Sequence, residues 1–379
     1  MDKLGIYVHI PFCAKKCYYC DFISYDDECE IIEEYIQSLV KEIKIKSKDF
    51  GKRQIYTIYI GGGTPSFLDS KYIVQIINAI KENYKINIKA EITIEVNPGT
   101  VTKIKLQDYK NCGVNRISIG LQSTNNEILK QIGRIHTYEN FLETYKLTRE
   151  VGFNNINVDL MLALPNQTIG QLEESIHEVI KLQPEHISLY SLILEENTKL
   201  FLDYEQRKLN LPSDEEERAM YWRTKRILEE AGYSHYEISN FAKMGYKSIH
   251  NTNCWEQKSY LGIGIAAHSY IENIRYSNII EIKEYIKNIK NGKIEENKII
   301  QEIQNTYTMQ KEFIMLGLRK IEGIKISDFK NKFVQNPIYI FRKEFDELVE
   351  NELILIDENV IKLTNKGIDF ANIVWEKFV

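Results

Sequence analysis

Three cysteine residues near the start of the chain are spaced like the ligands of a metal cluster. Cys13, Cys17 and Cys20 follow the pattern C-x3-C-x2-C, directly after an apolar run that begins at Leu4. Thiolates are soft ligands that suit zinc or iron-sulfur clusters, and an iron-sulfur cube needs one protein ligand for each iron. Three thiolates leave one iron of such a cube open to a small molecule. The spacing therefore favours a reaction site over a purely structural one.

A zinc site is the main alternative for the same three thiols. A fourth ligand such as His9 or Asp21 would complete it, but zinc sites usually show paired C-x2-C units and four ligands. A reduced thiol cluster without a metal is also possible. The other cysteines are scattered, which is unlike a disulfide framework and fits a reducing cytoplasm; they are Cys29, Cys112 and Cys254.

Further polar and glycine-rich segments follow the ends of predicted strands. The run Gly61-Gly62-Gly63-Thr64-Pro65 lacks Cβ atoms at three positions, so a ligand can approach its backbone closely. Carboxylates suit hydroxyl and ammonium groups, and a guanidinium can grip a carboxylate with two hydrogen bonds. Each polar residue alone is more typical of a helix cap or a surface charge. The four residues concerned are Glu95, Gln122, Arg134 and Asp159.

Alternating strand and helix patterns over about the first 240 residues predict the elements that position these side chains. The alternation predicts a parallel sheet with helical crossovers. The predicted strands are 4–10, 54–60, 91–96, 115–119, 154–162 and 186–192, and the predicted helices are 28–48, 70–83, 102–111, 138–151 and 169–182. Six such units suit a six-stranded open barrel, in which chemistry lies at the carboxyl ends of the strands.

The rest of the chain changes character twice. Helices are predicted at 198–208 and 214–231, followed by extra strands and loops over 232–242, 248–255 and 260–269. A segment rich in Lys, Glu and Asn at 281–303 predicts a helix and a solvated connector. From 306 the pattern predicts three helices, a hairpin at 352–363 and a closing helix at 364–378. We therefore expect a barrel at 1–240, a sheet extension and connector at 241–303, and a small domain at 304–379.

Composition limits the kinds of partner. The chain has 379 residues, 43% of them hydrophobic, and a net charge of -5. Three helices and a two-strand wing are also the parts of a winged helix, but acidic residues crowd that region, so we expect no nucleic acid partner. Residues 1–5 show no signal-peptide pattern, and no run approaches the roughly twenty apolar residues of a membrane span. We expect a cytoplasmic protein with at most peripheral membrane contact.

The cysteine segment carries a family resemblance. Tyr7-Val-His-Ile-Pro-Phe-Cys13 and Cys20-Asp-Phe22 resemble the radical SAM superfamily, and within it the HemW branch of oxygen-independent coproporphyrinogen III oxidase-like proteins. The likeness continues at 236–242, 260–269 and 312–319. It implies a partial (β/α)6 barrel with extra strands and a small, mainly helical C-terminal domain with a two-strand wing.

The resemblance also implies cofactors. A 4Fe-4S cluster would be held by Cys13, Cys17 and Cys20, and S-adenosylmethionine (SAM) by Tyr7, Tyr19, Gly63, Thr64, Glu95, Gln122, Arg134 and Asp159. Electron delivery from the reduced cluster into the sulfonium of SAM would yield methionine and a 5'-deoxyadenosyl radical.

A heme element is implied by a third likeness. The family's sequence motif H-N-x-x-Y-W matches residues His250 to Trp255, with Cys254 in place of the tyrosine. An imidazole is a common axial ligand of heme iron, and an indole offers an apolar ring to a porphyrin. The alternatives are a loop histidine bonded to a backbone carbonyl and, for Cys254, either a thiolate ligand or a small buried filler.

Two functions from different classes fit the resemblance. The first is a heme chaperone that binds heme and hands it to respiratory proteins. The second is coproporphyrinogen III dehydrogenase, which decarboxylates two propionates with SAM radicals. The dehydrogenase carries a further cysteine two residues after the third ligand, where this chain has Phe22, and a long N-terminal extension, where twelve residues precede Cys13. Both departures favour the chaperone, and another radical SAM enzyme is a third possibility.

Overall fold

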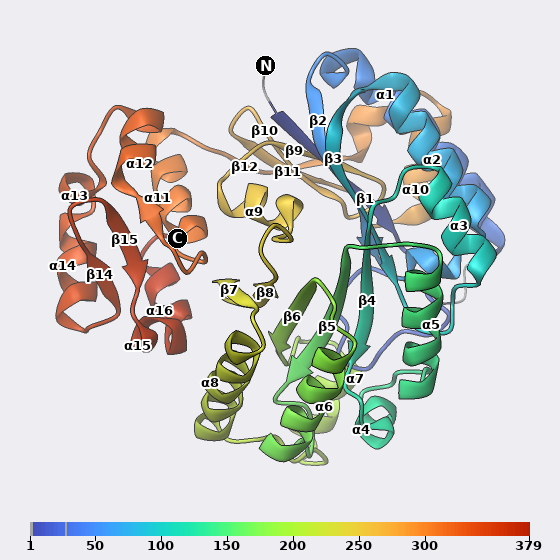
Figure 1. The fold of residues 1–379 in the computed structure, drawn as a ribbon. Coiled ribbons are helices and arrows are strands. Elements are labelled where there is room, and N and C mark those ends of the chain that lie inside the picture. The colour runs from blue at the N-terminus through green and yellow to red at the C-terminus, as the bar shows by residue number, and fades with distance from the viewer. Residues whose placement is uncertain (1–2, 27–28) are drawn as a thin grey trace.

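A twelve-stranded mixed sheet forms the body of the protein in the computed structural model, which describes residues 3–26 and 29–379 (Figure 1). Its central six strands are parallel and adjacent in chain order, which confirms the predicted topology. They are β1 (Lys3–Ile10), β2 (Gln54–Gly62), β3 (Lys85–Val96), β4 (Arg116–Gln122), β5 (Ile156–Leu162) and β6 (His186–Ser191). The predicted helix start at Glu28 and residues 1–2 lie outside the described residues.

Helices connect these strands and, apart from α4 at the carboxyl end of β4, cover the outer face of the sheet (Figure 1). They are α1 (Ile32–Phe50), α2 (Ser70–Asn83), α3 (Lys103–Asn111), α4 (Asn126–Gln131), α5 (Tyr138–Glu150) and α6 (Ile169–Lys181). Side-chain caps fix several helix starts, because they satisfy backbone N–H groups that have no partner in the first turn. Thr137 and Thr168 each form a complete capping box.

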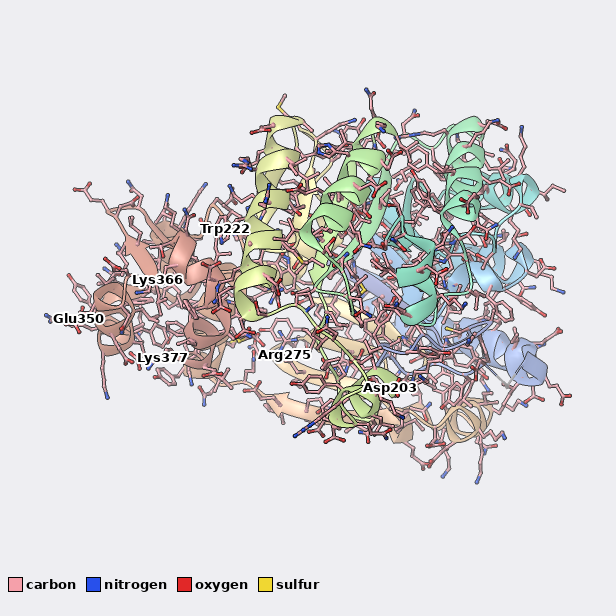
Figure 2. The ribbon with its side chains drawn as sticks, turned by 90° about the horizontal axis from the view of Figure 1, so that it is seen from below. Asp203, Trp222, Arg275, Glu350, Lys366 and Lys377 are labelled. Atoms are coloured by element: carbon pink, nitrogen blue, oxygen red, sulfur yellow. The ribbon has the colours of Figure 1, made fainter. Side chains whose placement is uncertain are left out.

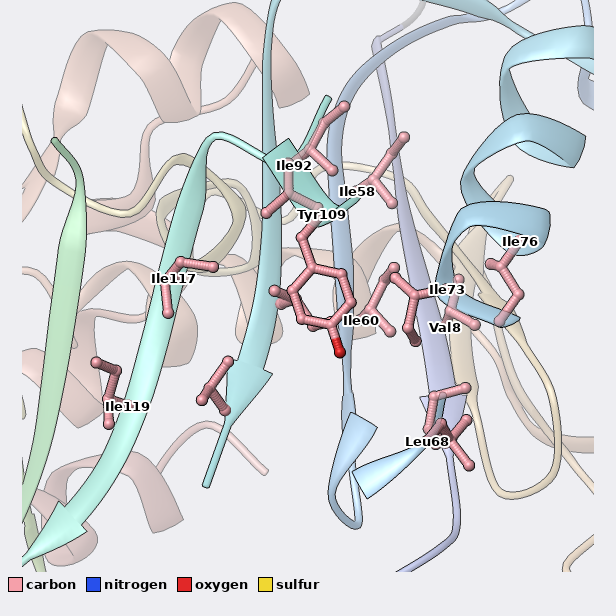
Figure 3. Close-up of a cluster of buried hydrophobic side chains, with 14 of the residues drawn as sticks. Val8, Ile58, Ile60, Leu68, Ile73, Ile76, Ile92, Tyr109, Ile117 and Ile119 are labelled. Atoms are coloured by element: carbon pink, nitrogen blue, oxygen red, sulfur yellow. The ribbon is translucent and has the colours of Figure 1, made fainter. Parts of the chain in front are cut away.

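The two faces of the central strands differ in chemistry because successive side chains point to opposite sides. On β4, Ile117 and Ile119 face outward into the hydrophobic core, where α2 and α3 pack on the strands (Figure 3). Ser118 and Gly120 alternate with them and line an inner cavity. Burial of apolar side chains thus fixes the outer layer and leaves the inner face for polar groups.

Extra strands extend the sheet at both edges, as predicted. Beside β6 lie β8 (Asn240–Ala242) and β7 (Ser234–Glu237). Beside β1 lie β9 (Tyr260–Ile263), β10 (His268–Ile271), β11 (Ile274–Asn278) and β12 (Lys298–Ile303). The predicted helices after β6 are also present, as α7 (Lys199–Glu205) and α8 (Asp214–Glu230).

Two predictions about local structure were wrong. Residues 248–255 contain the helix α9 (Ile249–Trp255), because Ser248 caps it and the Glu91 carboxylate accepts hydrogen bonds from the Ile249 and His250 amides at 3.0 and 2.9 Å. In residues 281–303 the predicted helix is present as α10 (Ile282–Lys290), but the predicted solvated connector was wrong, since it ends in β12, for which the free edge of β11 offers backbone partners. Distant tertiary partners outweigh local propensity in both segments.

The C-terminal segment has its own hydrophobic core and a three-stranded sheet, beside the barrel (Figure 1). Its strands are β13 (Ile324–Lys325), β14 (Ile354–Ile356) and β15 (Val360–Leu363). Its helices are α11 (Thr306–Gly317), α12 (Ile326–Phe333), α13 (Pro337–Ile340), α14 (Arg342–Glu350), α15 (Asn365–Asp369) and α16 (Ala371–Glu376). The predicted closing helix is interrupted at Phe370, so it is two helices.

Several side-chain contacts join this segment to the barrel, two of them between charged or aromatic residues of α8, β11, α11 and α15. The Trp222 indole on α8 donates to Asp369 at 2.7 Å, and Arg275 on β11 pairs with Glu312 on α11; Figure 2 labels Trp222 and Arg275.

Within residues 3–26 and 29–379 we find no helix with the length and apolar character needed to cross a membrane.

Candidate functional site

A cavity of 360 Å³ lies at the carboxyl ends of the parallel strands. It gathers all predicted cluster and SAM residues except Tyr7: Cys13, Cys17, Tyr19, Cys20, Gly63, Thr64, Glu95, Gln122, Arg134 and Asp159. Tyr7 lies behind the wall, where its hydroxyl is 3.0 Å from His9 Nδ1 and its ring stacks on Tyr59, which does line the cavity. The volume suits a small-molecule ligand.

The three thiols share one wall of the cavity and have polar neighbours. Thr64 donates to Cys13 Sγ at 3.4 Å, and Arg134 Nη1 donates to Cys17 Sγ at 3.6 Å. Burial raises the pKa of Cys13, and it raises that of Cys20 to about 11. The Cys13 and Cys20 thiols therefore hold their protons until a metal displaces them. Donors to the sulfurs suit an iron-sulfur cluster, whose properties depend on such bonds.

A single zinc ion would need a fourth ligand beside the three thiols. Among the described residues, no three His, Cys, Asp or Glu side chains are grouped to hold one metal ion. His9, weighed as a zinc ligand, has Nδ1 bonded to Tyr7 and Nε2 bonded to the Ile23 carbonyl at 2.8 Å, so neither nitrogen is available. Asp21 does line the cavity.

The glycine run packs tightly against the cysteine segment. The amide of Gly63 donates to the Ile10 carbonyl, and that of Thr64 to the Phe12 carbonyl, both at 2.8 Å. Gly62 has a φ of +113°, and a Cβ there would lie 2.5 Å from the His9 ring. Only glycine fits this position without strain. The run therefore fixes the cysteine segment against the end of β2.

Two carboxylates occupy neighbouring positions in the cavity. Glu95 accepts from the Tyr59 hydroxyl at 2.8 Å and from the Gly62 amide at 3.1 Å, and burial raises its pKa to about 7. Asp159 accepts from Asn157 at 2.7 Å and from Ser118 at 3.2 Å, and burial raises its pKa also. A cationic or hydroxyl-bearing ligand would restore the solvation that these acids lose.

On the facing side, Arg134 is held by two acceptors. Its Nη2 donates to Asn97 Oδ1 at 3.0 Å and to the Gly120 carbonyl at 2.5 Å. Gln122, at the end of β4, has a φ of 71°, which is unusual for a residue with a side chain. This conformation accompanies the register shift between Gly120 and Gln122. The cavity therefore presents the fixed Arg134 guanidinium and the buried acids Glu95 and Asp159 to a ligand.

Strand-end reasoning missed several lining residues. They are Tyr59, Asn97, Ser118, Met161 and Tyr190, together with further residues of the cysteine segment. Strand periodicity is the signal that would have found two of them. Ser118 lies two residues before Gly120, and Asn97 lies two residues after the predicted Glu95, so each shares the inward face.

The heme candidates lie outside the cavity, on α9. His250 is 8% exposed, and its Nδ1 lies 2.9 Å from the Thr57 hydroxyl, not against a backbone carbonyl. Burial lowers its pKa to about 4, so the imidazole is neutral. Trp255 has the Arg319 guanidinium over one ring face, with Cζ 4.3 Å from the ring centroid. Burial raises the pKa of Cys254 to about 11, which favours a thiol over a thiolate there.

The raised pKa of Glu95 gives a pH prediction. Its folded-state pKa of about 7 exceeds the ordinary 4.5, so its ionisation destabilises the fold as pH rises from about 4.5 to about 7. A cationic ligand needs the ionised form, so we expect affinity for SAM to fall about ten-fold between pH 8 and pH 6. Calorimetry measures the SAM affinity of the parent protein and of Glu95→Gln across this pH range. The affinity of Glu95→Gln should not depend on pH in this way. Parallel profiles for the two proteins would contradict the assignment.

Comparison with known families supports this description of the fold. Residues 7–179 match the model of the radical SAM superfamily, and residues 309–370 match that of the HemN C-terminal domain. The structure superposes on coproporphyrinogen III oxidase (HemN) from Escherichia coli with a TM-score of 0.87 and 24% identity, over 100% of this chain and 90% of that one. The protein is therefore a radical SAM protein with the fold of HemN.

Named relatives identify the family within this superfamily. The chain is 37% identical to the heme chaperone HemW of Lactococcus lactis subsp. lactis, over 98% of this chain and 96% of that protein. It is 35% identical to HemW of Bacillus subtilis, over 98% of both. HemW of Escherichia coli is 38% identical over 72% of this chain and 71% of its own length. The chain belongs to the HemW family.

Proposed function

We propose that this protein is a heme chaperone that binds a 4Fe-4S cluster, SAM and heme and transfers heme to respiratory proteins. The observation that supports it best is that one cavity gathers the three thiols, the buried carboxyls of Glu95 and Asp159 and the Arg134 guanidinium, in a chain related to HemW over nearly its whole length. The partners would be heme and the heme-accepting respiratory proteins.

The cofactor residues have distinct tasks in this proposal. Cys13, Cys17 and Cys20 hold the cluster, which when reduced supplies one electron to the sulfonium of bound SAM. The Arg134 guanidinium pairs with the carboxylate of SAM, and Glu95 and Asp159 accept from its ammonium and hydroxyl groups. The close backbone at Gly63 and Thr64, with Gln122 and Tyr19, encloses the ligand; Tyr7 supports Tyr59 from behind.

Coproporphyrinogen III dehydrogenase remains the second candidate, because the fold is that of HemN. Phe22 argues against it. This side chain lines the cavity and is 61% exposed, at the position where the dehydrogenase pattern has a further thiol. An exposed phenyl ring offers an apolar surface for a porphyrin but no metal ligand.

The heme site is proposed at His250. Metal-bound histidines usually bond their second ring nitrogen to a neighbouring group, as Nδ1 does here with Thr57, so Nε2 is the proposed ligand atom. The ring is nearly buried, so Nε2 must become accessible before it can coordinate heme iron.

Heme titration tests this assignment. His250→Ala should lose or shift the heme Soret band and leave the cluster and SAM binding intact, and Cys254→Tyr, which restores the family residue, should behave like the parent protein. The measurement is an anaerobic absorbance titration of the three proteins. An unaltered Soret band and affinity in His250→Ala would place the heme site elsewhere.

A further inference from the structure

A continuous chain of hydrogen bonds runs inside the barrel from the cavity to helix α9. Asn157 Nδ2 donates to Asp159 Oδ1 at 2.7 Å, and Asn157 Oδ1 lies 2.6 Å from His186 Nδ1. His186 Nε2 lies 2.8 Å from the Tyr236 hydroxyl. That hydroxyl accepts from the Ser248 amide at 3.2 Å. Between Asp159 and α9, all four linking residues are buried.

The direction of each bond follows from the chemistry of its partners. Asn157 uses its amide nitrogen on Asp159, so its oxygen must accept from an N–H at His186 Nδ1. Burial lowers the pKa of His186 well below its ordinary value, so the ring is neutral and Nε2 is an acceptor. Tyr236 therefore donates to Nε2. Every donor in the chain points toward the Asp159 carboxylate, and aligned bonds of this kind strengthen one another.

The far end of the chain meets the start of α9, whose Ile249 and His250 amides also donate to Glu91. Ser248 is the N-cap of this helix, and its side chain accepts from the Asn251 amide. At the other end, Trp255 packs on the Arg319 guanidinium, whose second face is covered by Trp375 on α16, with Cζ 4.6 Å from the ring centroid. Helix α9 thus lies between the cavity's hydrogen-bond chain and the C-terminal segment.

We propose that His186 and Tyr236 are positioning residues that couple the orientation of the Asp159 carboxylate to the position of α9 against the barrel. This inference rests on the proposed role of Asp159 in binding SAM. A ligand that fixes Asp159 stabilises the seated helix, and by linkage a displaced helix weakens the ligand.

Tyr236→Phe tests the coupling, with Tyr233→Phe as a matched control. The Tyr233 hydroxyl is also buried and donates to the Pro184 carbonyl at 2.7 Å, outside the chain. In wild-type and Tyr233→Phe protein loaded with the cluster, SAM should slow hydrogen exchange of amides 249–255. In Tyr236→Phe, SAM should bind about three-fold or more weakly, as for one lost hydrogen bond, and the slowing should disappear.

A second pair of variants separates positioning from general destabilisation. His186→Gln keeps one donor and one acceptor and should retain part of the SAM effect on α9, whereas His186→Leu should lose it. The proposal would be overturned if Tyr236→Phe had the same SAM affinity and the same hydrogen exchange in α9 as Tyr233→Phe. It would also be overturned if SAM left the hydrogen exchange of α9 unchanged in the wild-type protein. Absence of SAM binding in both wild type and Tyr233→Phe would instead refute the proposed function.

Discussion

Replacing any one of Cys13, Cys17 or Cys20 with alanine is expected to abolish the oxygen-sensitive 4Fe-4S cluster of the anaerobically purified protein. Each thiol lies at the same cavity, and a cube that already has one open iron cannot lose a second protein ligand without becoming labile. Iron and sulfide analysis with absorbance spectra measures the loss. This is the largest effect that we predict.

Cys112→Ala is the control for that series. Cys112 is also a buried cysteine, but its thiol donates to the Tyr109 carbonyl at 3.2 Å, in the outer core. Its variant should keep the full cluster content. Tight zinc without iron in the parent protein, or a full cluster in the triple alanine variant, would show that the three thiols serve another purpose.

Arg134→Ala should weaken SAM binding by about ten-fold or more, because one partner of a charge-assisted hydrogen bond is worth about 1.5 to 3 kcal/mol. Glu95→Ala should have a similar effect. Cluster content should stay normal, although Arg134 also donates to Cys17. Calorimetry with SAM on cluster-loaded protein measures the affinity of each variant.

Arg149→Ala provides a matched arginine. Its guanidinium pairs with Glu185 at 2.9 Å, away from the cavity. That variant should lose stability and bind SAM like the parent. Equal affinities in Arg134→Ala, Glu95→Ala and Arg149→Ala would mean that SAM binds elsewhere.

Local patterns carried the prediction of the central sheet. The apolar alternation and the caps are local signals, and the predicted helix at 70–83 coincides with α2. Parallel order follows from helices between consecutive strands, so the strand ends had to meet at one edge. Glu95 and Asp159 could therefore be grouped from sequence.

Residues with distant partners could not be placed in the same way. The seat of α9 depends on Glu91, 159 residues from His250, and on Thr57, 193 residues away. Nothing in the segment around His250 signals its burial. Tyr7 sits behind Tyr59 because the depth of a side chain within the barrel depends on the register between β1 and β2. Strand register follows from the assembled sheet.

The central claim is that this radical SAM protein carries heme and does not oxidise a porphyrinogen. Anaerobic incubation of the cluster-loaded protein with SAM, a reductant and coproporphyrinogen III, assayed for protoporphyrinogen, tests it most directly. The same preparation is loaded with heme and mixed with an apo respiratory heme protein. We predict no protoporphyrinogen and transfer of heme to the acceptor. Protoporphyrinogen formed in step with SAM consumption would contradict the account.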